Sequence, residues 1–418
     1  MVKKFKYNLN IIIFFLFYLS LLIGFYFDEN LNLGAIGDWL YTDLPVIEST
    51  SNDFIFTLLN YETFGHRHSP VYLFTLGFLK KIGFSFDLIR LLHLHLSLFL
   101  IYFFYKCLKF KFQNINNGLL LLISFSLFLS PTFRSLSIWP STRIIGLIFF
   151  LLSILEFFKY QRTLKEIYIW KNLFFLILSS YISPNFSVFI IFFFYHYLQK
   201  IKYERFFYII LFCIISSAPA FYYLFILDVN FLTAGTPGFE KGGHIGLNFN
   251  ISNKILIISS IIFFHLLPFL INKFFFNDLK KFINKKILIT TIIFFIINLF
   301  FFNYILNFTG GGIFFQLSQY VFGNNILFYL ISLISLIVLV FLCQGSINNF
   351  LIFALLIVSN IQNTIYHKYY DPLILILFFT LMNTPLTIQF FNRKKIFYYL
   401  YSFYVIFICL RLFKNYIY

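Results

Sequence analysis

The sequence predicts an all-α polytopic membrane protein with about thirteen transmembrane helices and a long first external loop. The chain is 60% hydrophobic and 24% aromatic with only 11% charged residues, which is more apolar surface than a soluble fold can bury. Several apolar runs are long enough to cross a hydrocarbon core of about 30 Å. A β-barrel would alternate apolar and polar positions, whereas these runs are apolar throughout: 10–27, 86–105, 206–227, 287–306 and 326–343.

Basic residues predict the orientation of the helices. Of the 32 Lys and Arg residues, 21 fall in six short clusters between apolar runs, as expected of cytoplasmic loops. This placement predicts a cytoplasmic N-terminus. It also accounts for the net charge of +17 without a nucleic-acid partner, so none is expected. The clusters are 3–6, 106–111, 159–171, 200–205, 273–286 and 393–395.

The segments between these clusters are then external. One transmembrane domain is expected over 1–418, with external loops at 28–85, 228–252 and 307–325 and shorter turns at 130–143, near Pro184 and at 367–372. Two predicted spans near Pro184, 172–183 and 186–199, are short. The apolar piece 71–83 has only about thirteen residues and contains Lys80 and Lys81, so we expect an amphipathic helix in the interface.

The first external loop holds a large share of the acidic residues. Seven of the fifteen Asp and Glu residues lie between 28 and 62, in a chain where carboxylates are scarce. A membrane protein that gathers carboxylates in one external loop holds them in water for chemistry or recognition. A solvated loop face is the expectation for four of the seven: Asp43, Glu48, Asp53 and Glu62.

Three short motifs lie within and after this acidic stretch. Gly-Asp-Trp-Leu-Tyr stands at 37–41, His-Ser-Pro-Val-Tyr at 68–72, and Arg90 with Leu91 begins the next span after Gly83. This order resembles the GT-C superfamily of integral-membrane glycosyltransferases, which includes protein O-mannosyltransferases and aminoarabinose transferases of lipid A. The turns 130–134 and 367–372 are similar to the family's second external turn and late turn. The resemblance covers roughly the first 160 residues and the late turn.

The resemblance implies transfer of a sugar from a polyprenyl-phosphate-linked donor to a lipid, glycan or protein acceptor. Such an enzyme needs a carboxylate that activates the acceptor hydroxyl or amine as a general base. Asp38 is the first candidate, because it lies upstream of the His-Ser-Pro motif as the family's essential acid does. Asp28 is the second, because Asp28 and Glu29 resemble the family's Asp-Glu pair.

External cations are the candidates for binding the donor phosphate, because negative charge grows on that group as it departs. The alternative for each arginine or lysine is contact with lipid headgroups. Tyr369 follows the late-turn lysine, and two histidines flank the first-loop arginine. The predicted substrate-binding set is His66, Arg67, His68, Arg134, Arg143, Lys368 and Tyr369.

No metal site or cofactor is predicted. Two histidines at i and i+2 without a third ligand are a poor metal pattern, and a divalent ion has no other support. The four cysteines are widely spaced in apolar runs and form no framework. Many family members carry a second acid in the turn after the third span, where this chain has Thr142. Either one carboxylate suffices, or the acceptor differs, or the chain is an inactive relative.

Two other functions compete with the transferase. An O-antigen-type polymerase or ligase uses the same donors, but the acid-rich first loop favours the transferase. A transporter of lipid-linked sugars would place charges near the membrane midplane, whereas this chain keeps them at loop ends. The expected location is the bacterial inner membrane, among membrane lipids, with the active site facing the periplasm.

Overall fold

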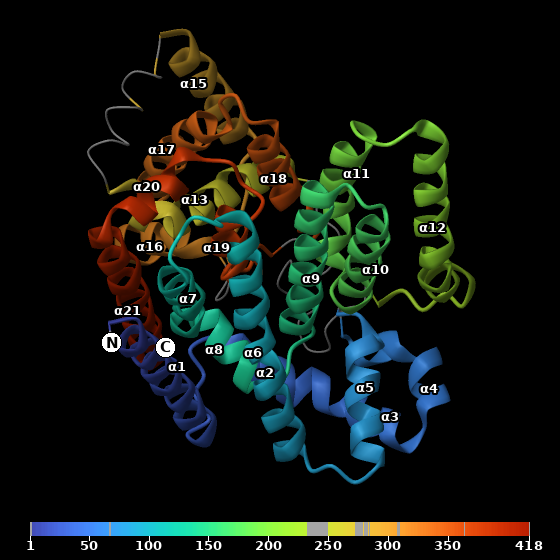
Figure 1. Cartoon of the computed structure of the whole chain (residues 1–418). Coiled ribbons are helices and arrows are strands. Elements are labelled where there is room, and N and C mark those ends of the chain that lie inside the picture. Colours follow the sequence, from blue (N-terminus) through green and yellow to red (C-terminus); the bar gives the residue numbers. More distant parts are fainter. Residues whose placement is uncertain are drawn as a thin grey trace. The chain divides into compact units, whose positions relative to one another are not determined.

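The computed structural model describes residues 2–66, 68–231, 250–271, 279, 283, 285–306, 310–362 and 364–417. All regular elements in this part of the chain are helices (Figure 1). Seven of them are long and apolar enough to cross a membrane, or eight if the bent pair 117–129 and 131–138 is one span. The seven are Leu9–Tyr26, Phe86–Lys111, Thr142–Thr163, Tyr203–Ile226, Ile251–Leu270, Ile326–Cys343 and Lys395–Asn415.

The chain is therefore an integral membrane protein of the polytopic all-α class, as predicted. The number of thirteen spans is not confirmed, since several predicted crossings are shorter helices. Ile167–Ile182, Pro184–Leu198 and Ile347–Val358 have 10–17 residues, and a helix rises only about 1.5 Å per residue. The predicted run 287–306 forms a helix only over Lys285–Phe300.

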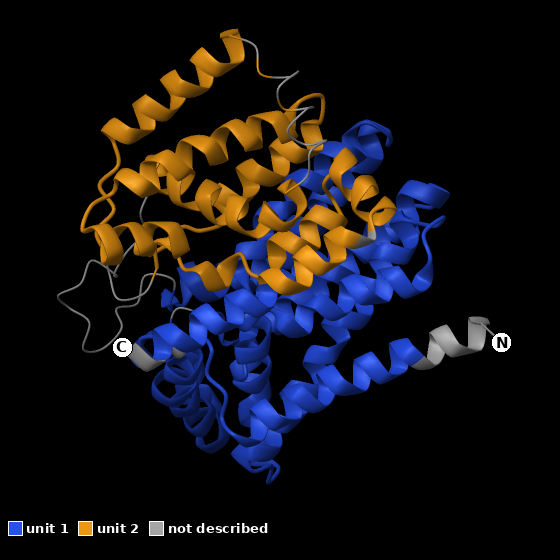
Figure 2. Ribbon diagram, turned by 90° about the vertical axis from the view of Figure 1, so that its left-hand side faces the viewer, with its two compact units in different colours: residues 1–241, 404–418 blue, residues 242–403 orange. Residues whose placement is uncertain are grey.

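The chain divides into two compact units, coloured in Figure 2. Unit 1 comprises Met1–Lys241 and Tyr404–Tyr418. Its helices, with short 3-10 and π turns labelled η, are α1 (Val2–Tyr26), α2 (Leu33–Asp38), η1 (Trp39–Asp43), α3 (Leu44–Asn52), α4 (Phe54–Leu59), η2 (Tyr61–Phe64), α5 (Pro70–Lys81), α6 (Phe86–Lys111), α7 (Asn117–Phe125), η3 (Ser126–Leu129), α8 (Pro131–Ile138), α9 (Thr142–Thr163), α10 (Ile167–Ile182), η4 (Pro184–Phe189), α11 (Ile190–Leu198), α12 (Tyr203–Phe221) and η5 (Tyr222–Ile226).

Unit 2 comprises Gly242–Phe403. Within it α13 packs against α15, α16, α17, α18 and α19, so α13 is its central helix. The predicted external loops 228–252 and 307–325 fall partly outside the described residues, at 232–249 and 307–309. The described helices are α13 (Ile251–Leu270), α15 (Lys285–Phe300), α16 (Gly312–Phe322), α17 (Ile326–Cys343), α18 (Ile347–Val358), η7 (His367–Tyr369), α19 (Leu373–Phe379), α20 (Pro385–Asn392) and α21 (Lys394–Ile417), the last of which continues into unit 1.

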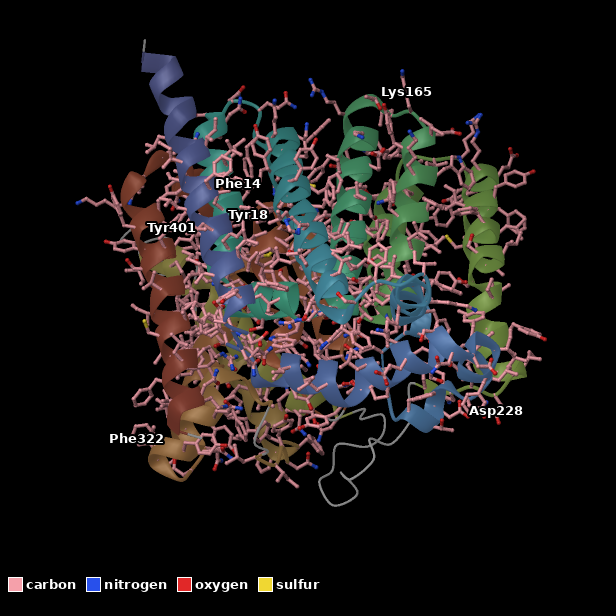
Figure 3. The ribbon with its side chains drawn as sticks, turned by 90° about the horizontal axis from the view of Figure 1, so that it is seen from below. Phe14, Tyr18, Lys165, Asp228, Phe322 and Tyr401 are labelled. Atoms are coloured by element: carbon pink, nitrogen blue, oxygen red, sulfur yellow. The ribbon has the colours of Figure 1, made fainter. Side chains whose placement is uncertain are left out.

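Loops of unit 1 alternate between its two ends. Lys165 and Asp228 lie at opposite ends of the unit 1 helices in Figure 3. The Tyr223 hydroxyl donates to the Leu58 carbonyl at 2.7 Å, so the first loop shares the Asp228 end. Glu166 and Arg205 form an ion pair, so the two loops that contain them share the other end. This alternation is the one expected from the basic clusters, whereas the side of the membrane that each end faces stays a prediction.

The first loop is a chain of short helices rather than an irregular segment. The predicted amphipathic helix 71–83 is confirmed as a helix, α5, with bounds close to those expected. It begins because Ser69 caps it and Pro70 takes a first-turn position, where a missing N–H costs nothing. It lies closely against α3, since a Cβ on Gly77 would be 2.5 Å from Thr50 Cβ. Figure 1 shows α3, α4 and α5 grouped together.

Candidate functional site

Asp28 stands where the first membrane helix ends. Its φ of 52° is in the left-handed region, which Asp tolerates better than most residues, and the turn closes with Glu29 N–H donating to Gly24 O at 2.7 Å. The Asp28 side chain is 60% exposed, and Arg90 Nη2 of α6 donates to it at 2.6 Å. This contact fixes an accessible carboxylate at the edge of the helix bundle of unit 1.

Arg90 is itself held by aromatic rings. Its guanidinium lies 3.8 Å from the Trp139 ring centre and 5.0 Å from that of Phe25. A planar guanidinium stacks well on aromatic faces, and the contact is stronger away from water. The Arg90 side chain is only 10% exposed, so its reach is confined to Asp28 and to a distant contact with Asp87. Arg90, the arginine of the motif that begins after Gly83, is thus the cation that orients Asp28.

Glu29 makes a second and more deeply buried ion pair beside the first. Arg134 of α8 donates to its two carboxylate oxygens at 2.6 and 2.5 Å. The other N–H groups of Arg134 reach Ser20 and the Phe128 carbonyl, so all three nitrogens have protein acceptors. Gly24 makes room for the pair, because a Cβ there would be 2.6 Å from Glu29 Oε2.

Trp139 joins these two ion pairs. Its ring supports Arg90, and its Nε1 donates to the Glu29 carbonyl at 3.1 Å. A further link comes from the Asn32 N–H, which donates to Ser135 Oγ of α8 at 3.0 Å. The segment that leaves α1 is therefore attached to α8 and α6 by polar contacts. We call Asp28, Glu29, Arg90, Arg134 and Trp139 the first-helix cluster.

Asp38, the first candidate base, is half-buried at the end of α2. Its carbonyl accepts from Thr42 Oγ1 at 2.6 Å as the chain passes into η1. The two aromatic residues near Asp38 have different surroundings. Trp39 is buried and packs edge-on against Phe86, whereas the Tyr41 ring is 80% exposed.

Asp43 and His66 form a buried pair inside the first loop. His66 Nδ1 accepts the backbone N–H of His68 at 3.0 Å, so Nε2 carries the proton and donates to Asp43. Both side chains are buried, so the expectation that Asp43 lies on a solvated loop face is wrong. The pairing could not be found locally, because the two residues are 23 positions apart.

Tyr61 and His68 complete this second group. The Tyr61 hydroxyl donates to the His68 carbonyl at 2.8 Å, and the His68 ring, which is half-buried, lies 5.1 Å from that of His66. Burial is the main cause that raises the pKa of Tyr61 well above 10, with the Asp43 charge adding to it. Arg67, predicted between the two histidines, lies outside the described residues.

A hydrogen-bonded histidine connects the loop to the membrane helices. The Tyr72 hydroxyl of α5 bonds His93 Nδ1 at 2.6 Å, and His93 Nε2 donates to the Leu136 carbonyl at 2.8 Å. His95 bonds Tyr18 and the Leu91 carbonyl. Both ring nitrogens of each histidine are therefore hydrogen-bonded within the protein.

The other predicted cations lie in different places. Arg143 is buried in the first turn of α9, 5.5 Å from the Phe186 ring. Lys368 belongs to unit 2, is half-buried, and lies 5.3 Å from the Tyr366 ring. The Tyr369 hydroxyl donates to Gln362 at 3.3 Å, and the adjacent His367 bonds His265 at 2.9 Å.

The described residues of unit 1 bring together Asp28, Glu29, Arg90 and Arg134, and separately Asp43, His66 and His68. Over the described part of the chain no three His, Cys, Asp or Glu side chains are grouped as metal ligands would be.

No protein-family model matches the chain, and no curated protein or solved structure matches it either.

Proposed function

We propose that this chain is an integral-membrane glycosyltransferase of the GT-C type. It would move a sugar from a polyprenyl-phosphate-linked donor to an acceptor on the external face of the membrane. The observation that supports this most is Asp28, an exposed carboxylate at the end of a membrane helix, oriented by Arg90, which in turn stacks on Trp139. The motif order that resembles the GT-C superfamily supports it further.

The proposed reaction needs one base and one cation. The acceptor hydroxyl or amine gives its proton to the Asp28 carboxylate, and the acceptor atom bonds to the anomeric carbon. The bond between that carbon and the phosphate oxygen breaks, and the lipid phosphate leaves with the electron pair. Its charge needs an external cation, for which Arg67, the adjacent His68 and Arg143 remain the candidates in unit 1.

Arg134 takes a different part in this proposal. Its nitrogens all bond protein acceptors, two of them on Glu29, so we assign it to holding the end of α1 in place. The reaction site would face the periplasm of a bacterial cell, with the N-terminus in the cytoplasm. Membrane lipids would surround the helices.

The test compares a deletion strain with strains expressing the chain and its variants. Mass spectrometry of glycolipids and glycoproteins should show a sugar that disappears on deletion and returns with the unchanged chain. Asp28→Asn keeps size and hydrogen bonding but removes the basic oxygen, so turnover should fall by about 10²–10⁴-fold. Glu48→Gln, at an exposed position of the same loop, is the matched control and should restore the sugar fully.

Asp38→Asn decides between the two candidate bases. If Asp38→Asn abolishes turnover while Asp28→Asn leaves it near normal, the base is Asp38. If both variants glycosylate normally, or if deletion changes no glycoconjugate, the transferase proposal is wrong.

A further inference from the structure

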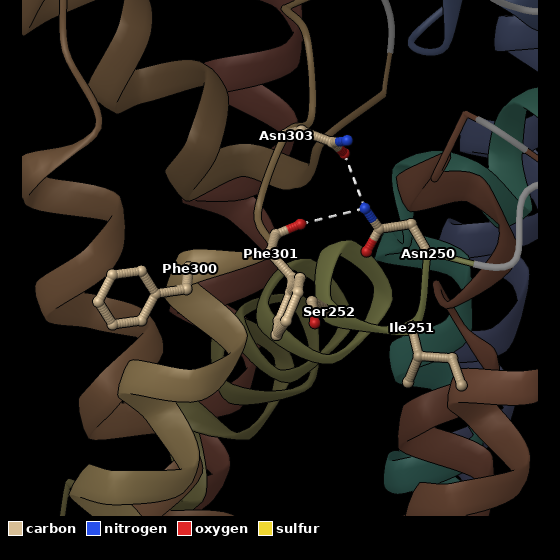
Figure 4. A pocket seen from close by; sticks show the side chains of 6 residues that line it. All are labelled: Asn250, Ile251, Ser252, Phe300, Phe301 and Asn303. Atoms are coloured by element: carbon tan, nitrogen blue, oxygen red, sulfur yellow. Dashed lines mark hydrogen bonds between the residues drawn. The ribbon is translucent and has the colours of Figure 1, made fainter.

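An open pocket of about 490 Å³ lies in unit 2, where α13 begins and α15 ends. Its lining is Asn250, Ile251, Ser252, Phe300, Phe301 and Asn303, shown in Figure 4. The two sides come from segments about fifty residues apart in the sequence, so only the tertiary fold makes the pocket. Both segments belong to the ends of their helices that are predicted to be external.

The polar wall of this pocket is a network of three asparagines. Asn250 caps α13 and donates from Nδ2 to Asn303 Oδ1 at 2.8 Å and to the Phe301 carbonyl at 3.1 Å. The buried Asn253 also donates to Asn303 Oδ1 at 2.8 Å and accepts the Asn303 N–H at 3.0 Å. These contacts hold the 301–303 segment against the first turn of α13.

The network fixes how the Asn303 amide is turned. Its Oδ1 accepts two N–H groups, so the Nδ2 donors must be on the other side of the amide. No described residue accepts from Asn303 Nδ2 or bonds to Ser252 Oγ. The exposed Asn303 amide therefore presents two N–H donors, and Ser252 adds a hydroxyl that both donates and accepts.

The other wall is aromatic and open. Phe300 is 82% exposed and Phe301 65% exposed, and both line the pocket beside the amides. None of the six lining residues is charged. A phosphate or a metal ion would need charged partners, and a purely apolar chain would not need the amide network. Amide and hydroxyl groups beside phenyl faces match a ligand with neutral hydroxyls and an apolar ring face.

We propose that this pocket binds a neutral sugar residue, with one face of the sugar ring on Phe301 and its hydroxyls on Asn303 Nδ2 and Ser252 Oγ. Because the donor includes a charged phosphate, the uncharged pocket fits the acceptor better, and the acceptor is then a glycan. This assignment to the acceptor rests on the proposed transferase function, whereas the binding of a neutral sugar does not.

The test is ligand-observed NMR on the purified full-length protein in detergent. The probes are the methyl glycosides of glucose, galactose, mannose and N-acetylglucosamine, with inorganic phosphate as the charged comparison. At least one glycoside should bind, and phosphate should not compete with it. Phe301→Ala should weaken that binding by roughly 3–10-fold, the effect of one lost contact.

Three variants separate recognition from folding. Asn303→Asp keeps the oxygen that accepts from Asn250 and Asn253 but removes the donors, so it should also weaken the glycoside. Phe301→Trp keeps an aromatic face and should retain binding. Phe322→Ala, at an exposed ring on α16 that is 55% accessible, should leave binding unchanged.

Two results would overturn the sugar site: no glycoside binds, or the Phe301→Ala and Asn303→Asp proteins bind as the unchanged chain does. Asp28→Asn and Asp38→Asn distinguish this failure from failure of the transferase function. If they leave glycosylation intact while the glycoside still binds through Phe301, the function is wrong and the sugar site stands. If Asp28→Asn abolishes turnover and Phe301→Ala affects neither binding nor turnover, the function stands and the site is wrong.

Discussion

Arg90 and Arg134 lie beside the same helix end, yet their different contacts give them different structural roles. Arg134 bonds protein acceptors through all three nitrogens and is buried, so it stabilises the contact between α1 and α8. Arg90 stacks on Trp139 and extends to the exposed Asp28. The sequence predicts Arg134 as a phosphate ligand and places Arg90 only at the start of the next span. Only the partners of each guanidinium show which one orients an accessible carboxylate.

We expect Glu29→Gln to destabilise the protein strongly, because it leaves the buried Arg134 cation without its counter-charge. Removing one partner of a buried ion pair costs roughly 3 kcal/mol or more. Thermal unfolding in detergent should show a clearly lower midpoint for Glu29→Gln. Glu48→Gln, at an exposed position, should unfold at the midpoint of the unchanged chain. Equal midpoints for both variants would mean that the Glu29 pair contributes nothing to stability.

Tyr61 makes the free energy of unfolding of the protein depend on pH in the alkaline range. Burial raises its folded-state pKa well above 10, while the unfolded tyrosine titrates near 10. Above pH 10 the unfolded state loses a proton that the folded state keeps, so the free energy of unfolding falls as pH rises. Its contribution is complete below pH 10 and is lost above it, by about 1.4 kcal/mol per pH unit.

Tyr61→Phe should therefore make the unfolding midpoint fall less steeply between about pH 9.5 and about pH 11. This range brackets the pKa of about 10 of an unfolded tyrosine. The variant also loses the bond to the His68 carbonyl, so its midpoint at neutral pH should be somewhat lower. Tyr41→Phe changes an exposed ring of the same loop and is the control. An alkaline decline as steep in Tyr61→Phe as in the unchanged chain would contradict this account.

Small and polar residues bring whole helices together in unit 1. Ser179 of α10 donates to the Gly146 carbonyl of α9 at 2.7 Å, and Asn172 donates to Ser153 at 2.8 Å. The Tyr197 hydroxyl of α11 reaches Asn172 in turn at 2.8 Å. In lipid there is little hydrophobic force between helices, so close packing and such hydrogen bonds determine their association.

Gly146→Ala should strain the contact of α9 with the end of α10 and with η4, because its Cβ would lie 2.7 Å from Ser183 Cβ and 3.2 Å from the Phe186 ring. We expect a loss of about 1–3 kcal/mol, the usual cost of overpacking. Gly37→Ala is the matched control, since no atom lies within 4 Å of its Cβ and alanine favours the helix α2. Unfolding midpoints in detergent measure both variants, and an unchanged or raised midpoint for Gly146→Ala would contradict the overpacking expected here.

The basic clusters predict the orientation of the molecule in the membrane. Successive loops of unit 1 alternate between its two ends. The basic clusters predict which of these ends faces the cytoplasm. Asn116 caps α7 at the end of unit 1 where the first membrane helix starts, since a Cβ on the nearby Gly118 would be 3.0 Å from Asn10 Nδ2. Ser51, in the first loop, lies at the other end.

Cysteine labelling tests this orientation in intact cells. Cys409 is exposed, so the four natural cysteines are first replaced by alanine. Ser51→Cys should then react with an impermeant reagent, and Asn116→Cys should react only after the membrane is opened. Labelling of Asn116→Cys in intact cells without labelling of Ser51→Cys would reverse the orientation.

The sequence by itself determined the class of this protein and its local elements. Apolar content and run length require helices in lipid, and Ser69 with Pro70 begins α5 through contacts within one turn. The tertiary structure decided the partners: Glu29 with Arg134 across 105 positions, Asp43 with His66, and Asn303 with Asn250 and Asn253. The physical reason is range. Helix formation and burial in lipid depend on neighbours within a few residues, whereas the pairing of polar groups depends on which helices pack together.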